Sequence, residues 1–357
     1  MTTTDTGRHQ APEEPVAPQR VWAEFRDAVS LRTVGLIVGV LLLQIGFILS
    51  YVGAFHAPTP HRIALGVVSA SAPAAQQTAG QLSAISGEPL AAEAVADRAT
   101  AEDRIRQGEL SAALIVDASS TTDTLLVSSG GGASVATAVT AVVQQAEATQ
   151  QRTVSVTDLV PLQSGDARGL TGFYLVIGWI VGGYLVAALL GVASGARPAT
   201  PRRAYFRLVA IVPYAILSGL AGAFVVDQVL GALTGHFVAL WWLGALVVAS
   251  AATVTMAFQV LFGVIGIGVT VLVFVVLGNP SAGGAYQSEL LPPFWRGLTD
   301  ALPNGAGTDA VRHLVYLEGT GITGHLLVIA AYVVVGAVIA VAASHLRHRR
   351  TVTGHAA

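Results

Sequence analysis

The sequence predicts a multi-pass α-helical membrane protein with six transmembrane helices and an α/β domain inserted between the first and the second. Three observations support this fold class. Of the 357 residues, 53% are hydrophobic and only 11% are charged, whereas about 25% of the residues in a soluble domain are charged. Several uncharged runs are long enough to cross a hydrocarbon core of about 30 Å as helices. One polar block, residues 56–170, separates the first of these runs from the others.

The residue types exclude several classes of function. The formal net charge is −2 and there is no cysteine, so the sequence predicts no nucleic-acid partner, no disulfide and no cysteine-based metal site. All basic residues are arginines, and without lysine neither a Walker A loop nor a Schiff base forms. The chain therefore carries no nucleotide motor of its own, and we predict no catalytic, cofactor-binding or metal-ligating residue.

The stretch Pro161–Gly195 marks the passage from water to membrane. Its first part is polar, and residues 172–192 carry no charge. Gly178 and Gly182 are four residues apart and Gly183 follows them, which predicts a face of bare backbone for close helix packing in lipid. Glycine is frequent in this chain, with 39 residues, so a chance pattern is the alternative.

The N-terminal part predicts a cytoplasmic approach to the membrane. Residues 1–19 are rich in Thr, Pro, Glu and Ala, which is typical of a disordered tail. Residues 20–32 form an amphipathic pattern with Trp22 and Phe25 at helical spacing, which predicts an interfacial helix. An ordinary helical lead-in to the first span, 34–55, is the alternative.

The first span reads as a signal anchor, because a long polar segment precedes it and its apolar run has full length. Arg20, Arg26 and Arg32 lie on its N-terminal side. Under the positive-inside rule that side is cytoplasmic, so the block 56–170 lies outside the cell.

Residues 56–170 predict a folded α/β domain, because β-rich runs alternate with helical patterns. No Ser–His–acid set or cluster of His and carboxylates stands out in it. The expected strands are 62–68, 90–96, 111–117, 123–129 and 153–159, and the expected helices are 72–85, 101–107 and 134–151.

Residues 171–345 predict a bundle of five more spans, with a turn at Phe258–Gly263 and a basic cytoplasmic tail at 346–357. An outer amphipathic segment, 290–318, contains two short helical pieces, Pro293–Leu302 and Asp309–Leu317, joined by a Pro-Asn-Gly turn. The expected spans are 172–192, 208–226, 237–257, 261–278 and 325–344.

A second group of arginines lies between the second and third spans, at Arg197, Arg202, Arg203 and Arg207, with no acidic residue among them. This loop is therefore cytoplasmic, and both termini lie on the same side. Together with Trp22 and Phe25, these arginines form a candidate surface for coupling to a cytoplasmic partner. The alternative is that they serve only topology and contact with anionic lipids.

Three segments carry a resemblance to a known family: GELSAALIV (Gly108–Val116), PLQSGDARGLTGFYLVIGWIVGGYL (Pro161–Leu185) and LPPFWRGLTDALPNGAGTDAVRHLVY (Leu291–Tyr316). With the order of spans and outer domain, the chain resembles the membrane subunits of type-2 ABC exporters. Within them it resembles the YhgE/Pip (phage infection protein) branch and its actinobacterial relatives. The resemblance implies the plasma membrane of a bacterium, a homodimer or paired permease, and a separate ATPase.

Two functions of different classes follow. The first is an ABC-type permease that moves a lipid, drug or envelope compound. The second is a non-transporting envelope protein whose bundle anchors an outer partner-binding domain. No expected span has an ionisable residue in its middle, which disfavours self-powered, proton-driven transport.

Overall fold

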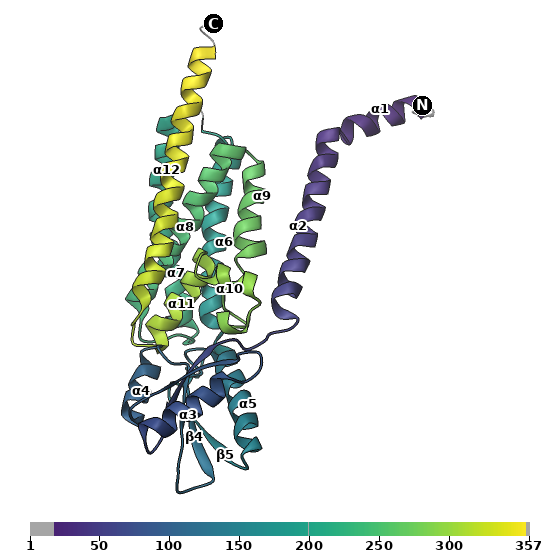
Figure 1. The fold of residues 1–357 in the computed structure, drawn as a ribbon. Helices are drawn as coiled ribbons and strands as arrows, with labels where there is room; N and C mark the ends of the chain where they lie inside the picture. Colours follow the sequence, from purple (N-terminus) through teal and green to yellow (C-terminus); the bar gives the residue numbers. More distant parts are fainter. Residues whose placement is uncertain (1–17, 199, 355–357) are drawn as a thin grey trace, which may run out of the picture. The chain divides into compact units, whose positions relative to one another are not determined.

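The computed structural model describes residues 18–198 and 200–354 (Figure 1). The chain forms two units, Met1–Gly46 and Phe47–Ala357, and each is described by itself. The first unit contains α1 (Pro18–Ala28) and most of α2 (Leu31–Phe55). Ser30 separates the two helices, because its hydroxyl accepts from Thr33 N at 3.3 Å and so caps the start of α2. The tail expected at 1–19 falls almost wholly outside the described residues.

Among the described residues, five helices are long and apolar enough to cross a membrane, which is consistent with a multi-pass membrane protein. They are the spans Thr33–Phe55, Thr171–Ala193, Pro201–Val229, Phe237–Phe262 and Ile322–Arg349. The helices that contain them are α2, α6 (Thr171–Ser194), α7 (Pro201–Phe224) continued by the π-helical turn η2 (Val225–Val229), α8 (Phe237–Phe262) and α12 (Ile322–Gly354).

The chain reverses after α8 at Gly263, whose φ of +68° favours glycine. The expected fourth span ended at residue 257, so α8 is longer than predicted. The expected fifth span, 261–278, is shorter in the structure: α9 (Ile265–Val271) and the π-helical η3 (Leu272–Leu277). Together they extend about 20 Å at 1.5 Å per residue, less than a hydrocarbon core.

The segment between η3 and α12, predicted as an outer amphipathic segment, also differs from the prediction. It contains the short 3-10 turn η4 (Ser288–Leu290), α10 (Pro293–Thr299) and α11 (Pro303–Tyr316). The Pro-Asn-Gly sequence predicted as a turn is instead the first turn of α11. Pro303 occupies the first helical position, where its fixed φ and missing N–H suit a helix start.

A five-stranded sheet lies between α2 and α6 in the chain, in the order β2-β1-β3-β4-β5. β1 pairs in parallel with β2 and β3, β3 pairs antiparallel with β4, and β4 pairs in parallel with β5. The strands are β1 (Ile63–Val68), β2 (Leu90–Ala94), β3 (Ala112–Ile115), β4 (Thr122–Val127) and β5 (Thr153–Asp158).

Helices cover both faces of this sheet, which gives a three-layer α/β domain. α3 (Ala72–Ser83) and α5 (Ala133–Thr149) cover one face, where Leu65, Leu114 and Val139 are fully buried. α4 (Arg98–Arg106) covers the other face, with Ile105 against Leu126 and its neighbours. Strand and helix patterns in the sequence coincide with these elements to within a few residues.

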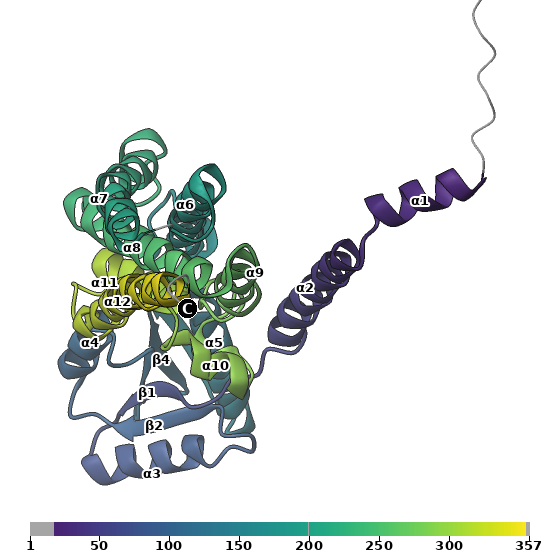
Figure 2. The same cartoon turned by 90° about the horizontal axis from the view of Figure 1, so that it is seen from above.

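In the bundle, α8 packs against α6, α7 and α12. Viewed from above, α6 and α7 lie next to each other along one side of α8, and α12 lies along the opposite side (Figure 2). The buried core between them includes Trp179, Val247 and Val248. At the end nearer the sheet, α11 packs against α6, α8 and α12.

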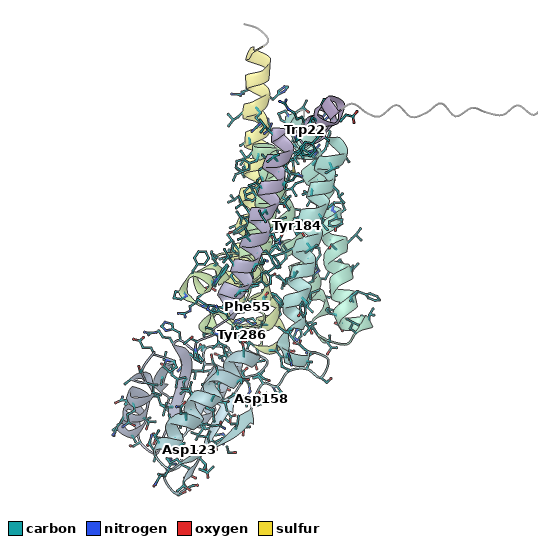
Figure 3. All side chains as sticks on the ribbon, turned by 90° about the vertical axis from the view of Figure 1, so that its right-hand side faces the viewer. Trp22, Phe55, Asp123, Asp158, Tyr184 and Tyr286 are labelled. Atoms are coloured by element: carbon teal, nitrogen blue, oxygen red, sulfur yellow. The ribbon has the colours of Figure 1, made fainter. Side chains whose placement is uncertain are left out.

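A buried ionic cluster joins the strands and helix of the α/β domain at its end away from the bundle, where Figure 3 shows Asp123. Asp123 is fully buried and receives two charge-assisted hydrogen bonds from Arg152, at 2.7 and 2.5 Å. Glu147 is 3% exposed and lies 3.6 Å from Arg152. Burial, and then the neighbouring Asp123 carboxylate, raise the pKa of Glu147, while Arg152 acts in the opposite direction.

We expect Glu147→Gln to stabilise the protein at pH 8 and to flatten its stability between pH 4 and pH 8. A raised folded-state pKa means that protonated Glu147 adds stability below its unfolded pKa of about 4.3, and that this stability is lost as pH rises through the folded pKa. A neutral amide at this position does not ionise, so the protein does not lose this stability as pH rises. The measurement is thermal unfolding against pH, with exposed Glu88→Gln as the control; equal pH profiles of wild type and Glu147→Gln would contradict the expectation.

Candidate functional site

The arginines predicted as a cytoplasmic loop lie mostly on a helix. α6 ends at Ser194 and α7 begins at Pro201, so the loop is only 195–200. Thr200 caps α7 by accepting from Arg203 N at 3.3 Å, and Pro201 occupies the first helical position. This Thr-Pro pair is a helix start signal that was available in the sequence. The third span therefore begins seven residues before the predicted position at 208.

Two of the four arginines are exposed on the first turn of α7. The Arg202 guanidinium carbon lies 5.5 Å from the centre of the Phe206 ring, a cation–π contact worth about 0.5–1 kcal/mol at an exposed site. Arg203, the next residue, is also exposed. These two side chains are accessible to a partner.

The other two arginines contact the chain itself. Arg207 is 8% exposed and donates from Nη2 to Gly195 O at 2.9 Å, at the end of α6. Arg197 lies beside Gly263, just past the end of α8, where an added Cβ would be 3.4 Å from its guanidinium. Sequence reasoning missed Arg347, whose Nη2 donates to Leu261 O at 2.5 Å.

The C-terminal end of α8 explains the positions of Arg197 and Arg347. The last carbonyls of a helix have no partner within it and carry a partial negative charge. Cations from two other parts of the chain lie there. Of the four arginines predicted for coupling, Arg197, Arg202 and Arg203 are exposed and Arg207 is buried; Arg202 and Arg203 are the two on the first turn of α7.

Trp22 and Phe25 belong to the first unit, and only their own surroundings within it are described. Their side chains are 67% and 54% exposed. Their rings form an edge-to-face pair with centroids 5.9 Å apart. This exposed aromatic pair on α1 has the composition expected of an interfacial helix.

The three glycines predicted for packing have three different surroundings. An added Cβ at Gly183 would collide with Val248 O of α8, so α6 and α8 are in backbone contact there. At Gly182 it would lie 3.2 Å from the Tyr214 hydroxyl, and at Gly178 it would meet nothing within 4 Å. Gly183 is thus the packing glycine, and Gly178 is open.

The junction between the α/β domain and the bundle brings together the three segments on which the family resemblance rests. Thr320 Oγ1, just after α11, donates to Gln107 O at 2.7 Å, beside the start of Gly108–Val116. Tyr316 of α11 donates from its hydroxyl to Asp166 Oδ2 at 2.7 Å, in the segment before α6. The sequence pattern indicated each segment separately and did not predict that they meet.

Tyr316 is the centre of this junction. Its ring lies so close to Gly130 that a Cβ there would be 2.6 Å from a ring carbon. Asp166, which is 1% exposed, accepts from Tyr316 and from Thr171 N at 2.9 Å. Burial, and then the Asp166 hydrogen bond, raise the pKa of Tyr316, so its phenol remains a proton donor in neutral solution.

Gln287 joins the two parts at a second point. Its Oε1 accepts from Val135 N at 3.2 Å and from Ser134 Oγ at 2.5 Å. Both donors lie in the first turn of α5, whose own capping residue, Gly132, has no side chain to offer. A residue from the segment between η3 and α10 therefore caps a helix of the α/β domain.

Leu290 makes the third connection. It is 3% exposed and is part of the core under α3 and α5, with Leu65 and Leu114. Two backbone hydrogen bonds hold this segment in place: Thr59 N donates to Leu290 O at 3.2 Å and His61 N donates to Glu289 O at 2.9 Å. The α/β domain thus takes part of its core from a segment more than a hundred residues further along the chain.

Aromatic rings cover the same region. Phe55 at the end of α2 and Tyr286 lie side by side in Figure 3, with ring centroids 5.9 Å apart. Trp295 of α10, 8% exposed, packs with Ala54 and Leu291. Because Tyr286 directly precedes Gln287, this apolar layer lies beside the contacts of Gln287.

A polar cavity of about 150 Å³ lies at the junction, lined among others by Ser111, Ser128, Arg312, His313 and His325. Burial lowers the pKa of His313, whose Nδ1 lies 2.6 Å from Thr320 O. Within 18–198 and 200–354, no group of three or more His, Cys, Asp or Glu side chains is placed to hold a metal ion.

Comparisons with known proteins give no relative. No protein-family model, curated protein or solved structure matches this chain. The function is therefore argued from the sequence and the geometry above.

Proposed function

We propose that the protein is a permease-like subunit of an ABC-type exporter, similar to the YhgE/Pip branch of the type-2 group. It moves a lipid, drug or cell-envelope compound across the plasma membrane of a bacterium, as a homodimer or paired permease. A separate ATPase supplies the energy. The chain crosses the membrane six times, with the α/β domain outside and both termini in the cytoplasm.

The interlocked junction is the observation that carries this proposal. A domain that is merely anchored needs only a linker to its membrane helix. Here Leu290 lies in the core of the α/β domain, Gln287 caps α5, and Tyr316 contacts Gly130 and Asp166. A shift of α10 or α11 in the bundle is therefore transmitted to the outer domain, as packed interfaces transmit movement between elements.

The distribution of charge supports the orientation. Arg202 and Arg203 lie at one end of the bundle, and Arg347 lies at the same end, beside the C-terminal end of α8. Under the positive-inside rule this is the cytoplasmic end. The short segment α9–η3 returns the chain to the outer side as the fifth of the six crossings, and Asn304 of α11 donates to Phe274 O at 2.9 Å.

The second candidate function is a non-transporting envelope protein whose outer domain binds a partner. A groove between α3 and α5 favours it, with a volume of about 580 Å³, within the range of small-molecule sites. Leu82, Ile85 and Val142 are among its apolar lining residues, Gln81 and Gln145 are among its polar ones, and no charged residue lines it. We expect changes on the cytoplasmic side to leave this partner binding intact.

Charge reversal of Arg202→Glu with Arg203→Glu tests the first function. If a motor docks on this turn of α7, the double variant loses most of the co-purifying ATPase and any transport phenotype, since like charges then face an acidic partner surface. Pull-down followed by an ATP hydrolysis assay measures this. The matched control is Arg98→Glu with Arg106→Glu on α4, exposed arginines of the α/β domain.

Orientation must be verified in the same variants, because arginine loss also affects topology. A reporter inserted at Ser120 should read outside, and one fused at Ala357 inside. Ser120 lies in an exposed turn, so an insertion there leaves the junction around Tyr316 intact. If topology, ATPase and phenotype all persist in the double variant, the arginines only set orientation.

A further inference from the structure

The sheet of the α/β domain ends in two different edges, β2 and β5. An edge strand presents backbone N–H and C=O groups to which another strand can bind, and proteins block such edges with charges or local contacts. The edge at β2 is blocked. The Ser83 hydroxyl accepts from Ala92 N at 2.9 Å and donates to Ala92 O at 3.2 Å. The next residue, Glu93, is exposed and forms an ion pair with Arg104 at 2.6 Å.

The edge at β5 is open. Thr153 N donates to Thr121 O at 2.9 Å, so the backbone groups of Thr153 and of every second residue after it face β4. Because hydrogen bonding alternates along a strand, the N–H and C=O of Val154 and Val156 point away from β4. Within the described part of the chain, β5 pairs with β4 alone. No proline and no charged residue interrupts positions 153–157.

The sequence of β5 is complementary to itself. Residues 152–158 read Arg-Thr-Val-Ser-Val-Thr-Asp, a palindrome around Ser155 with opposite charges at its two ends. When two copies pair antiparallel about Ser155, threonine lies opposite threonine, valine opposite valine and serine opposite serine. Arg152 lies opposite Asp158 of the second copy, so like charges do not meet. Arg152 remains bound to Asp123, and the attraction between the ends adds to that ion pair.

This register also agrees with the direction of the open backbone groups. It places Val154 opposite Val156 of the second copy, and both carry outward N–H and C=O groups, so they exchange hydrogen bonds. A shift by one residue would place an outward group opposite one already bonded to β4, and no ladder would form. A shift that centres the pair on Val156 would place Asp158 opposite Val154 and separate the opposite charges.

The side chains of β5 are free to meet a second copy. Thr153, Ser155 and Thr157 are exposed and share one face of the strand. On the other face Val154 packs against the core under α5, whereas Val156 is 42% exposed. Pairing would cover this valine and bring the hydroxyl groups of the two strands within reach of each other.

We propose that two copies of the protein bind each other through β5, paired antiparallel about Ser155, so that their sheets become one continuous sheet. The interaction rests on the proposed function in one respect, since it names the surface by which the copies of the proposed homodimer meet. Two short strands form a small interface, and a shared membrane favours it by keeping the copies close together. A homodimer that uses another surface would overturn this proposal and leave the proposed function standing.

Oxidative cross-linking of the full chain in native membranes tests the proposal. The chain has no cysteine, so Ser155→Cys introduces a single thiol. Opposite residues of a non-hydrogen-bonded antiparallel pair have Cα atoms about 4.5 Å apart, and disulfides span about 4.4–6.8 Å between Cα atoms. Oxygen with copper phenanthroline should convert most of this variant into disulfide-linked dimers. Absence of the dimer, or its formation only after solubilisation in detergent, overturns the proposal.

Two further cysteines test the register. Thr157→Cys alone should cross-link poorly, because its thiol and that of the second copy would be about 13 Å apart along the strands. Thr153→Cys and Thr157→Cys chains expressed together should cross-link with each other. Ala94→Cys, at an exposed position of β2, is the matched control for chance collision and should remain largely unlinked. Equal cross-linking at Ser155, Thr157 and Ala94 would indicate collision and contradict the proposal.

A proline separates strand pairing from mere proximity. Val156→Pro, added to Ser155→Cys, removes an N–H that points away from β4, and an edge strand accommodates proline there. We expect loss of most of the cross-linked dimer, with thermal unfolding showing that the domain remains folded. Undiminished cross-linking would contradict strand pairing, and the register test stands without this variant.

The identity of the occupant is tested with the purified chain. A strand of another protein is the other occupant of an open edge. Purified Ser155→Cys protein reconstituted in liposomes should form the same disulfide-linked dimer as in native membranes. If it cross-links in native membranes and not in liposomes, another component brings the strands together, and direct pairing of two copies is overturned.

Discussion

Replacing Leu290 by Ala is expected to destabilise the α/β domain by about 2–5 kcal/mol, the cost of a large-to-small change in a well-packed core. The side chain is 3% exposed and packs under α3 and α5. The cavity left there cannot close easily, because strands and helices on both sides of it are fixed by the sheet. This is a large share of the stability of a domain, which is about 5–15 kcal/mol.

Urea unfolding of the purified full chain in detergent, followed by near-UV circular dichroism, measures this loss. The matched control is Leu230→Ala, since Leu230 is 65% exposed and leaves no cavity. If Leu290→Ala were as stable as Leu230→Ala, the outer segment would not be part of the domain core. The interlocked junction, and the argument for force transmission, would then fail.

The same variant separates the two candidate functions. In a permease, a loosened junction weakens the connection between α10, α11 and the outer domain, so a transport phenotype should decline even at temperatures where the domain remains folded. A binding domain on an anchor should retain its ligand under those conditions. The two readouts can be taken from one protein preparation.

Elements governed by local pattern were predictable from the sequence. The strands from β1 to β5 coincide with β-rich runs, and α3, α4 and α5 coincide with helical patterns between them. The starts of α7 and α11 were missed, although Thr200-Pro201 and Pro303 are recognisable helix starts. The predicted boundaries followed hydropathy, and a helix whose first turn is polar begins before its apolar run does.

Contacts between distant residues were not predictable in the same way. Gln287 and Ser134 are 153 positions apart, and Tyr316 and Asp166 are 150 apart. The sequence around Gln287 does not distinguish it from an exposed glutamine. Its capping role exists only after both parts of the chain have folded. Likewise, Arg197 and Arg207 look like loop charges in the sequence, and their intramolecular contacts depend on the ends of α6 and α8.

The glycines of α6 show most clearly which contacts the sequence could not predict. The helix is apolar all round, so no polar face indicates which side meets a neighbour. The i, i+4 spacing of Gly178 and Gly182 drew attention to one face. Gly183, one position further and about 100° around the helix, is the residue that contacts the backbone of α8.

Replacing Gly183 by Leu should therefore be far more damaging than the same change at Gly178. At Gly183 even the first added carbon would collide with Val248 O, and it would lie 2.9 Å from Ala251 Cβ. Both helices are long and packed on other sides, so neither can move away freely, and overpacking costs about 1–3 kcal/mol or more. At Gly178 the added side chain enters open space, and we expect little loss of stability.

Thermal unfolding in detergent, with size-exclusion chromatography for the oligomeric state, distinguishes the two positions. Gly182→Leu should be intermediate, because the atoms nearest to it are the ends of the Tyr214 and Ser218 side chains, which can rotate. If Gly183→Leu is stable while Gly178→Leu dissociates an oligomer, Gly178 marks a contact between copies of the chain. The packing argument from Gly183 would then have to be withdrawn.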